Sequence, residues 1–225
     1  MLLRALAFAL LAWVLPAQAN LDAITNQDAA SGLKAALEKG AVAAVDLLGK
    51  TDGFFGNSAV KIPLPDSLKK YEKLMRGVGM GKYADELELT MNRAAEAAVP
   101  EAKKLFVDSA RKMTVEDAKG ILAGGQTSGT DYFKRTTSDE LRAKFLPIVK
   151  QSTAKVKLAD KYNQYAQKGV AYGLVKKDQA NLDEYVTQKT LDGLFHMVGE
   201  EEKKIRQDPL QAGSSIIQKA FGALK

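Results

Sequence analysis

The chain has 225 residues, a formal net charge of +6 at neutral pH and no cysteine. The missing cysteine excludes disulfides, thiolate metal sites and a lipid-carrying cysteine near the N-terminus. The single histidine, His196, reduces any histidine-based zinc site to one ligand, and no D-x-[DN]-x-[DN]-G calcium loop is present. We therefore expect no metal and no other cofactor.

The N-terminus has the order of a secretory signal peptide. Arg4 precedes an uncharged apolar run from Ala5 to Leu15, and the small residues Ala17 and Ala19 follow. This run of 11 residues is shorter than the roughly 18 to 20 that span a bilayer. We expect cleavage before Asn20 and a periplasmic or secreted product without a transmembrane segment. An uncut N-terminal anchor is the alternative.

Helical periodicity dominates the rest of the chain, because apolar residues recur at 3.6-residue spacing between helix start and stop signals. After a signal peptide at residues 1–19, we expect a single all-α domain at residues 20–225, a bundle of about nine or ten helices. The predicted helices span residues 28–48, 66–77, 82–99, 101–112, 115–123, 130–136, 139–154, 158–173, 182–206 and 214–223. The first helices should pack against the long helix at 182–206.

Two local patterns refine this prediction. An irregular loop is expected near residues 49–65, where glycines and prolines surround the alternating sequence AVKI, which is typical of a short extended segment. The sequences TVED at Thr114 and SDEL at Ser138 both have a hydroxyl residue followed by acids, as helix N-caps do.

The helix at 82–99 carries the first candidate site. Its stripe of Leu87, Met91 and three alanines predicts close packing against another helix, whereas Asn92 and Glu96 lie on a second side with Leu89. A helix that is apolar on two sides lies within a core, so both polar side chains would need partners there. We interpret the segment as a packing seam with polar pins, and keep a chemical site as the alternative.

A second candidate site lies on the helix at 182–206. Glu202 falls on its apolar stripe between Val198 and Ile205, and Arg206 is its nearest partner four residues later. The interpretation we prefer is a structural ion pair near the helix end. The alternative is a general acid or base with a shifted pKa.

The glycine-rich sequence GILAGGQTSGTDYFKR suggests a third candidate site. Thr130 is a plausible helix cap there, and the candidate binding residues Tyr132, Lys134 and Arg135 follow it. The free N–H groups of a helix N-terminus attract anions, so a phosphate or carboxylate could bind, although the glycines also explain a simple turn between helices.

A tyrosine stripe is the fourth. Leu158, Tyr162, Tyr165, Gly169 and Tyr172 advance by alternating steps of four and three residues. Such a stripe can form a core seam or line an apolar groove, and we expect the core seam.

The positive charge is uneven along the chain. Residues 61–82 contain six basic and two acidic residues, and residues 134–157 contain seven and two. For an exported protein, the partners to expect are anionic lipid, glycan or an envelope protein rather than nucleic acid, although a solvated surface explains the charges equally well.

Several segments together resemble the bacterial domain-of-unknown-function family 4197. They are DAASGLKAALEKGAVAAVDLLGKTDGFFGN, VKIPLP, MNRAAEAAVPEAKKLFVDSARKMTVEDAKGIL, YFKRTTSDELRAKFLPIV and EEEKKIRQDP, in order from about Asp28 to Leu224. The resemblance implies an exported, largely helical protein and supplies no activity and no catalytic residues. The family would have alanine where Gly129 stands, which should loosen the start of that helix.

The leading functional hypothesis is a non-enzymatic binding or interaction module for an apolar or anionic envelope ligand. One alternative is a carboxylate-dependent hydrolase of envelope glycans with Glu96 or Glu202 as the acid, which needs two acids about 5 to 10 Å apart across a cleft. The other is a structural partner in an envelope complex, which would expose a broad apolar patch.

Overall fold

A computed structural model describes residues 26–211 and 215–222, and the predicted signal peptide at residues 1–19 lies outside these ranges. Within them the fold is all-α, as the periodicity predicts, and no β-strand is present. The elements are α1 (Asn26–Leu48), α2 (Asp66–Gly77), α3 (Gly81–Ala98), η2 (Val99–Glu101), α4 (Ala102–Lys112), α5 (Val115–Ala123), α6 (Ser128–Thr153), α7 (Lys157–Ala171), η3 (Lys177–Gln179), α8 (Leu182–Gln207) and α9 (Ser215–Gly222), where η marks a 3-10 helix.

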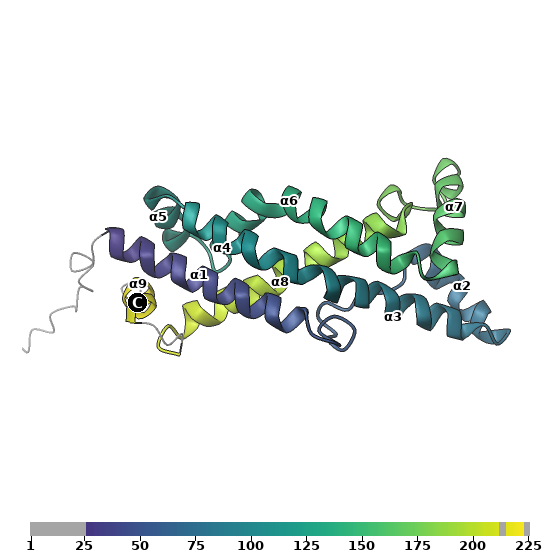
Figure 1. Ribbon diagram of the computed structural model, residues 1–225, viewed down its shortest axis with the longest axis horizontal. Coiled ribbons are helices and arrows are strands. Elements are labelled where there is room, and N and C mark those ends of the chain that lie inside the picture. The colour runs from purple at the N-terminus through teal and green to yellow at the C-terminus, as the bar shows by residue number, and fades with distance from the viewer. Residues whose placement is uncertain (1–25, 212–214, 223–225) are drawn as a thin grey trace, which may run out of the picture.

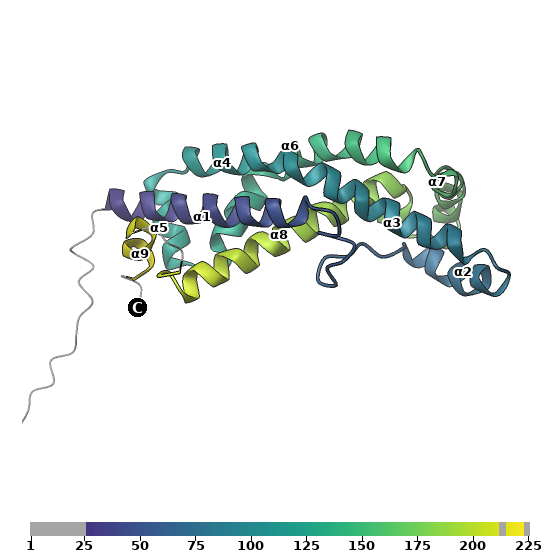
Figure 2. The ribbon, with the colours of Figure 1, turned by 60° about the horizontal axis from the view of Figure 1, so that its bottom comes forward.

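The long helices run roughly along the long axis of an elongated bundle (Figures 1 and 2). At one end, α5 and α9 lie near the start of α1. At the other end lie α2 and α7, with the turn that joins α2 to α3. No helix in the described ranges is both long and apolar enough to cross a membrane.

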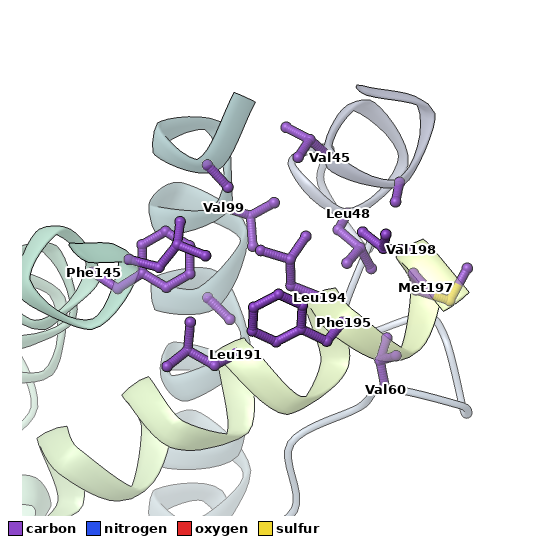
Figure 3. Packing of buried hydrophobic residues seen from close by; sticks show 14 of the residues in the cluster. Val45, Leu48, Val60, Val99, Phe145, Leu191, Leu194, Phe195, Met197 and Val198 are labelled. Atoms are coloured by element: carbon purple, nitrogen blue, oxygen red, sulfur yellow. The ribbon is translucent and has the colours of Figure 1, made fainter. Parts of the chain in front are cut away.

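The helix α8 lies at the centre of the core. Its residues Leu194 and Val198 pack among Leu48 of α1, Val99 of η2 and Phe145 of α6 (Figure 3). This packing confirms the expectation that the first helix lies against the helix at 182–206. It also leaves few positions on α8 exposed, so a polar residue on its inner face must find a partner inside the protein.

The prediction of two helices at 130–136 and 139–154 is wrong, because α6 is continuous from Ser128 to Thr153. Its buried residues recur every four positions at Phe133, Thr137, Leu141, Phe145 and Val149. This unbroken stripe buries one face of the helix, and tertiary packing therefore overrides the local start signal. Ser138, predicted as an N-cap, instead donates its hydroxyl to the carbonyl of Lys134 at 2.6 Å within the helix.

The other predicted cap is confirmed. Thr114 Oγ1 accepts from the backbone N–H of Asp117 at 3.0 Å, and the Asp117 carboxylate accepts from the N–H of Thr114 at 3.1 Å. The bond from the Thr114 N–H, and a second from the Thr114 hydroxyl at 2.8 Å, lower the pKa of Asp117 because they stabilise its charged carboxylate.

The loop between α1 and α2 is irregular, as predicted, but the extended segment expected at 59–62 is wrong. The N–H groups of Val60 and Lys61 both donate to the carbonyl of Asn57, which folds this stretch into a turn. Asp52, earlier in the loop, has a left-handed backbone with φ of 66°. A loop of this kind depends on bonds from other elements, and these come from α3.

Candidate functional site

Asn92 of α3 binds the backbone of the loop between α1 and α2. Its Oδ1 accepts from the N–H of Ile62 at 2.8 Å, and its Nδ2 donates to the carbonyl of Ile62 at 2.9 Å and to that of Glu88 at 2.8 Å. The side chain is fully buried and bonds to both the N–H and the C=O of one residue, as a neighbouring strand would. Its polar groups are therefore used inside the fold.

One turn later on α3, Glu96 binds the other part of the same loop. Its Oε1 accepts from the N–H groups of Phe54 and Phe55 at 3.0 and 3.1 Å, and its Oε2 accepts from Arg93 at 2.6 Å. Arg93 also bonds to Asp52 at 2.8 Å. The structure thus confirms that this helix packs in the core and that its two buried polar residues have partners. Asn92 and Glu96 both bind backbone groups of the loop between α1 and α2.

Glu202 is 3% exposed and lies against the N-terminus of α6. Its carboxylate accepts from the N–H groups of Gly129 and Thr130 at 2.9 and 2.8 Å and from the Thr130 hydroxyl at 2.8 Å. Arg206 completes the shell with two bonds to Oε1 at 3.0 and 2.8 Å. The predicted ion pair is confirmed, and the carboxylate also serves as a cap supplied by another helix.

The glycine-rich segment therefore does bind an anion, and that anion is the protein's own carboxylate. Gly129 is needed for this close approach, since a Cβ there would lie 2.3 Å from Cδ2 of Leu37 and 3.0 Å from Oε1 of Glu202. The expectation that Gly129 loosens the helix start is wrong, because its N–H is bonded and its surroundings are tightly packed. Arg206 also donates to the carbonyl of Ile121 at 3.0 Å, which ties α5 to the same cluster.

Of the remaining candidates of this segment, Tyr132 and Arg135 contact each other, whereas Lys134 lies apart from them. Tyr132 is buried, its hydroxyl donates to the carbonyl of Ser109 at 3.2 Å, and burial raises its pKa. Arg135 lies over the Tyr132 ring, 5.4 Å from its centroid, whereas Lys134 lines a separate surface hollow with Arg142 and His196. No common anion site unites Thr130, Lys134 and Arg135 in the described part of the chain.

Neither buried glutamate is placed to act as a general acid. A catalytic acid must reach the substrate, whereas Glu96 and Glu202 are each surrounded by donors from the protein itself. Beside Glu202 lies a hollow of about 10 Å³, which is about the size of one water molecule. The hydrolase alternative, as stated for these two residues, gains no support.

The tyrosine stripe of α7 divides between core and surface, so the expectation of a core seam is wrong for two of its three tyrosines. Tyr162 is buried, but Tyr165 is 70% exposed and Tyr172 is 80% exposed. The reason is that α7 crosses the end of the bundle (Figure 2), so only one edge of its stripe meets other helices.

A groove of about 570 Å³ opens along this stripe. One wall comes from α7, the opposite wall from the first turn of α2, and the turn after α7 closes the end. Its lining is mostly apolar: Leu68, Leu158, Tyr162, Tyr165, Ala166, Leu174 and Val175, with Ser67 and Gly169. The one charged side chain in the lining is Lys161. A volume of this size suits a small apolar ligand, and a lone cation favours an anionic group on it.

Buried hydroxyls hold the floor of the groove in place. Tyr162 donates its hydroxyl to the carbonyl of Gln179 at 2.6 Å and lies 3.0 Å from the hydroxyl of Ser67 on α2. Behind it, Tyr185 of α8 donates to the carbonyl of Pro63 at 3.0 Å, and burial raises the pKa of Tyr185 to about 12. These bonds join α7 to α2 and η3, and α8 to the loop before α2, so the groove is part of the folded bundle.

From the sequence, a core seam is the preferred interpretation of this stripe and a groove the alternative. The stripe alone does not show how far a neighbouring helix extends along it. One clue was available, since Gly173 and Leu174 interrupt the pattern directly after the stripe. Gly173 has a left-handed backbone with φ of 67°, and the turn it makes brings Leu174 and Val175 back beside Gly169.

A family model described as Protein of unknown function (DUF4197) covers residues 23–222. No curated protein and no solved structure matches the chain.

Proposed function

The chain belongs to the DUF4197 family of uncharacterised proteins, and from the geometry of its own surface we propose that it is an exported binding protein for an anionic amphiphile. The apolar part of the ligand lies in the groove between α2 and α7, and its acidic group lies near Lys161. The protein holds this ligand without transforming it.

The observation that carries this proposal is the exposed apolar lining of the groove. Tyr165 and Leu174 are 70% and 73% exposed, although each is large enough to bury substantial apolar area. Leaving them in water forgoes about 1.5 to 3 kcal/mol per side chain that burial could contribute, so an apolar ligand gains that much by covering each. A well-formed groove with a few polar groups is the usual form of a small-molecule site.

The charge of the groove favours an acid over a neutral lipid. Lys161 lines it, and Lys157 lies one turn earlier on α7. Asp66, at the start of α2, accepts bonds from Gln179 at 3.2 Å and from Lys176 at 3.1 Å. These bonds lower the pKa of Asp66 and pair its carboxylate with groups of the protein. The groove therefore has one lysine, Lys161, in an otherwise mostly apolar lining.

Titration with a long-chain fatty acid and with the matching neutral alcohol, both below their micelle concentrations, tests the proposal. The acid should bind more tightly, and the double variant Tyr165→Ser and Leu174→Ser should weaken both ligands by at least about tenfold. Tyr172→Ser is the matched control, because this tyrosine is equally exposed on the same segment but does not line the groove.

A charge variant separates the two parts of the ligand. Lys161→Gln should weaken the acid by about threefold to tenfold and leave the alcohol unchanged, whereas Lys168→Gln, outside the lining, should change neither. The proposal fails if neither ligand binds, or if Tyr172→Ser weakens binding as much as the groove variant does. Native mass spectrometry of the protein from its own compartment would identify the amphiphile.

A further inference from the structure

Exposed apolar side chains concentrate at the α2–α7 end of the bundle. Ten large apolar residues are exposed in the described ranges. Four of them lie on α2, the turn after it and the start of α3: Leu74, Val78, Met80 and Tyr83. Tyr165, Tyr172 and Leu174 lie on α7 and its following turn, at the same end of the molecule (Figures 1 and 2). Seven of the ten therefore gather in one region, which single surface residues scattered by chance would not do.

The same end carries the positive charge of the protein. Residues 66–85 and 155–179 together contain eleven Lys and Arg against five Asp and Glu, a net charge of +6, equal to the formal charge of the whole chain. The rest of the molecule is therefore close to neutral. Exposed apolar groups and the excess of cationic residues thus share one end of the molecule.

The tip of this end is a braced turn. Gly79 has a left-handed backbone with φ of 76°, and the exposed Val78 and Met80 lie on either side of it. Arg76 bonds to Glu72 on its own helix and to Asp85 on α3, which ties the two helices together below the tip. Lys82 lies over the ring of Tyr83, 5.2 Å from its centroid. The turn is therefore held in one shape while its apolar side chains point to solvent.

From this combination we infer that the α2–α7 end docks on the surface of an anionic lipid bilayer. Apolar side chains at the tip enter the boundary between head groups and acyl chains, and the surrounding lysines meet anionic head groups. Neither contribution alone gives firm attachment, but an apolar anchor and a basic patch together do. A protein partner of ordinary composition gives no reason for a net charge of +6 around the apolar residues.

The tip of this surface, at the turn between α2 and α3, is distinct from the amphiphile groove, although Tyr165 and Leu174 belong to both. Leu74, Val78 and Met80 do not line the groove. Docking would bring the mouth of the groove close to lipid, yet either property can exist without the other.

Co-sedimentation with vesicles tests the inference. The purified protein should bind vesicles of phosphatidylethanolamine and phosphatidylglycerol in a three-to-one ratio, and bind pure phosphatidylcholine at least about tenfold more weakly. Added salt should reduce the binding, since screening weakens the attraction between exposed charges.

Two matched pairs of variants locate the surface. Leu74→Ser should reduce the partition coefficient by about fivefold to tenfold, whereas Leu210→Ser, at a leucine of similar exposure elsewhere, should not change it. Lys82→Glu should reduce binding to the anionic vesicles by about tenfold or more, and Lys119→Glu on α5 should have little effect although it makes the same change in net charge.

The inference is wrong if the protein ignores the anionic vesicles, or if the Leu210 and Lys119 variants lose as much binding as their counterparts. Capture of a single envelope protein through Leu74, with no vesicle binding, would also overturn it and assign the surface to a protein partner. Fatty-acid titration of the Leu74→Ser variant keeps the two proposals separate, because the groove should retain its affinity when docking is lost.

Discussion

Glu202 on α8 and Tyr165 on α7 both interrupt or extend an apolar helical stripe, and the fold treats them in opposite ways. Around Glu202, helices α1, α5, α6, α8 and α9 converge, and the described donors to its carboxylate come from the protein itself. Around Tyr165, the bundle ends and an aromatic side chain stands 70% exposed above a groove. The residue that looks more chemical in the sequence is thus structural, and the one that looks like core is available to a ligand.

The difference follows from which groups lack a partner. A buried carboxylate without donors would be costly, so its presence in a stable core implies that the core already satisfies it. An exposed apolar side chain carries no such penalty and can gain free energy only from something outside the chain. In the described part of this molecule, the side chains that could gain most from a bound partner are therefore apolar, and they concentrate at the α2–α7 end.

Glu202→Gln should produce the largest effect at the closed region. It leaves the Arg206 guanidinium, which is mostly buried, without its carboxylate, and we expect the free energy of unfolding to fall by about 3 to 5 kcal/mol in urea denaturation. Glu201→Gln is the neighbouring control, since its ion pair with the exposed Lys204 lies at the surface and should contribute less than about 1 kcal/mol. A loss below about 1 kcal/mol for Glu202→Gln would mean that this cluster does not stabilise the fold.

Asn92→Ala should come next. The backbone N–H and C=O of Ile62 both lose their partner, and we expect the free energy of unfolding to fall by about 2 to 3 kcal/mol together with faster proteolysis within residues 49–65. Glu86→Ala, on the exposed side of the same helix, is the control for the change in α3 itself. Equal proteolysis of the two variants would show that the loop does not depend on Asn92.

High pH should destabilise the part of the bundle where Tyr185 of α8 bonds to the loop before α2. The pKa of Tyr185 is raised to about 12 from an ordinary value of 10.0, so the folded state favours the neutral phenol. This contribution to stability is complete below about pH 10 and is lost as the pH rises through about 12, and its size is on the order of 2 kcal/mol. Tyr185→Phe should cost about 1 kcal/mol at neutral pH through the lost bond to Pro63.

Urea denaturation at a series of pH values from about 8 to about 12 checks this prediction. The Tyr185→Phe variant should show a flatter loss of stability above pH 10 than the unmodified protein. Burial raises the pKa of Tyr162 as well, so part of the loss should remain. Identical curves for the two proteins would exclude Tyr185 as a source of the pH dependence.

The groove variants should produce the smallest change in stability. Tyr165→Ser and Leu174→Ser alter side chains that are mostly exposed, so each should change the free energy of unfolding by no more than about 0.5 kcal/mol. Thermal and urea unfolding of the single variants measure it. A loss above about 2 kcal/mol would place these residues in the core after all and remove the basis for a ligand site.

Much of the fold is readable from the chain because helix periodicity and caps are local. The predicted helices at 66–77 and 115–123 coincide with α2 and α5, and the burial of Asn92 and Glu96 follows from a helix that is apolar on two sides. The pairing of Glu202 with Arg206 is local too, since four residues separate them on one helix. Contacts of this kind need no knowledge of which helices meet.

The sequence by itself determined the all-α class, the buried stripes and the need of each buried acid for a partner, because 3.6-residue periodicity and desolvation act at every position regardless of the rest of the fold. Only the tertiary structure decided that α6 is unbroken at Ser138, that Glu202 caps a helix more than seventy residues away, and that α7 overhangs the bundle end. Those outcomes depend on which faces meet across long stretches of chain. An apolar stripe in the sequence predicts an apolar face of a helix, whereas the packing of neighbouring helices decides whether that face is buried.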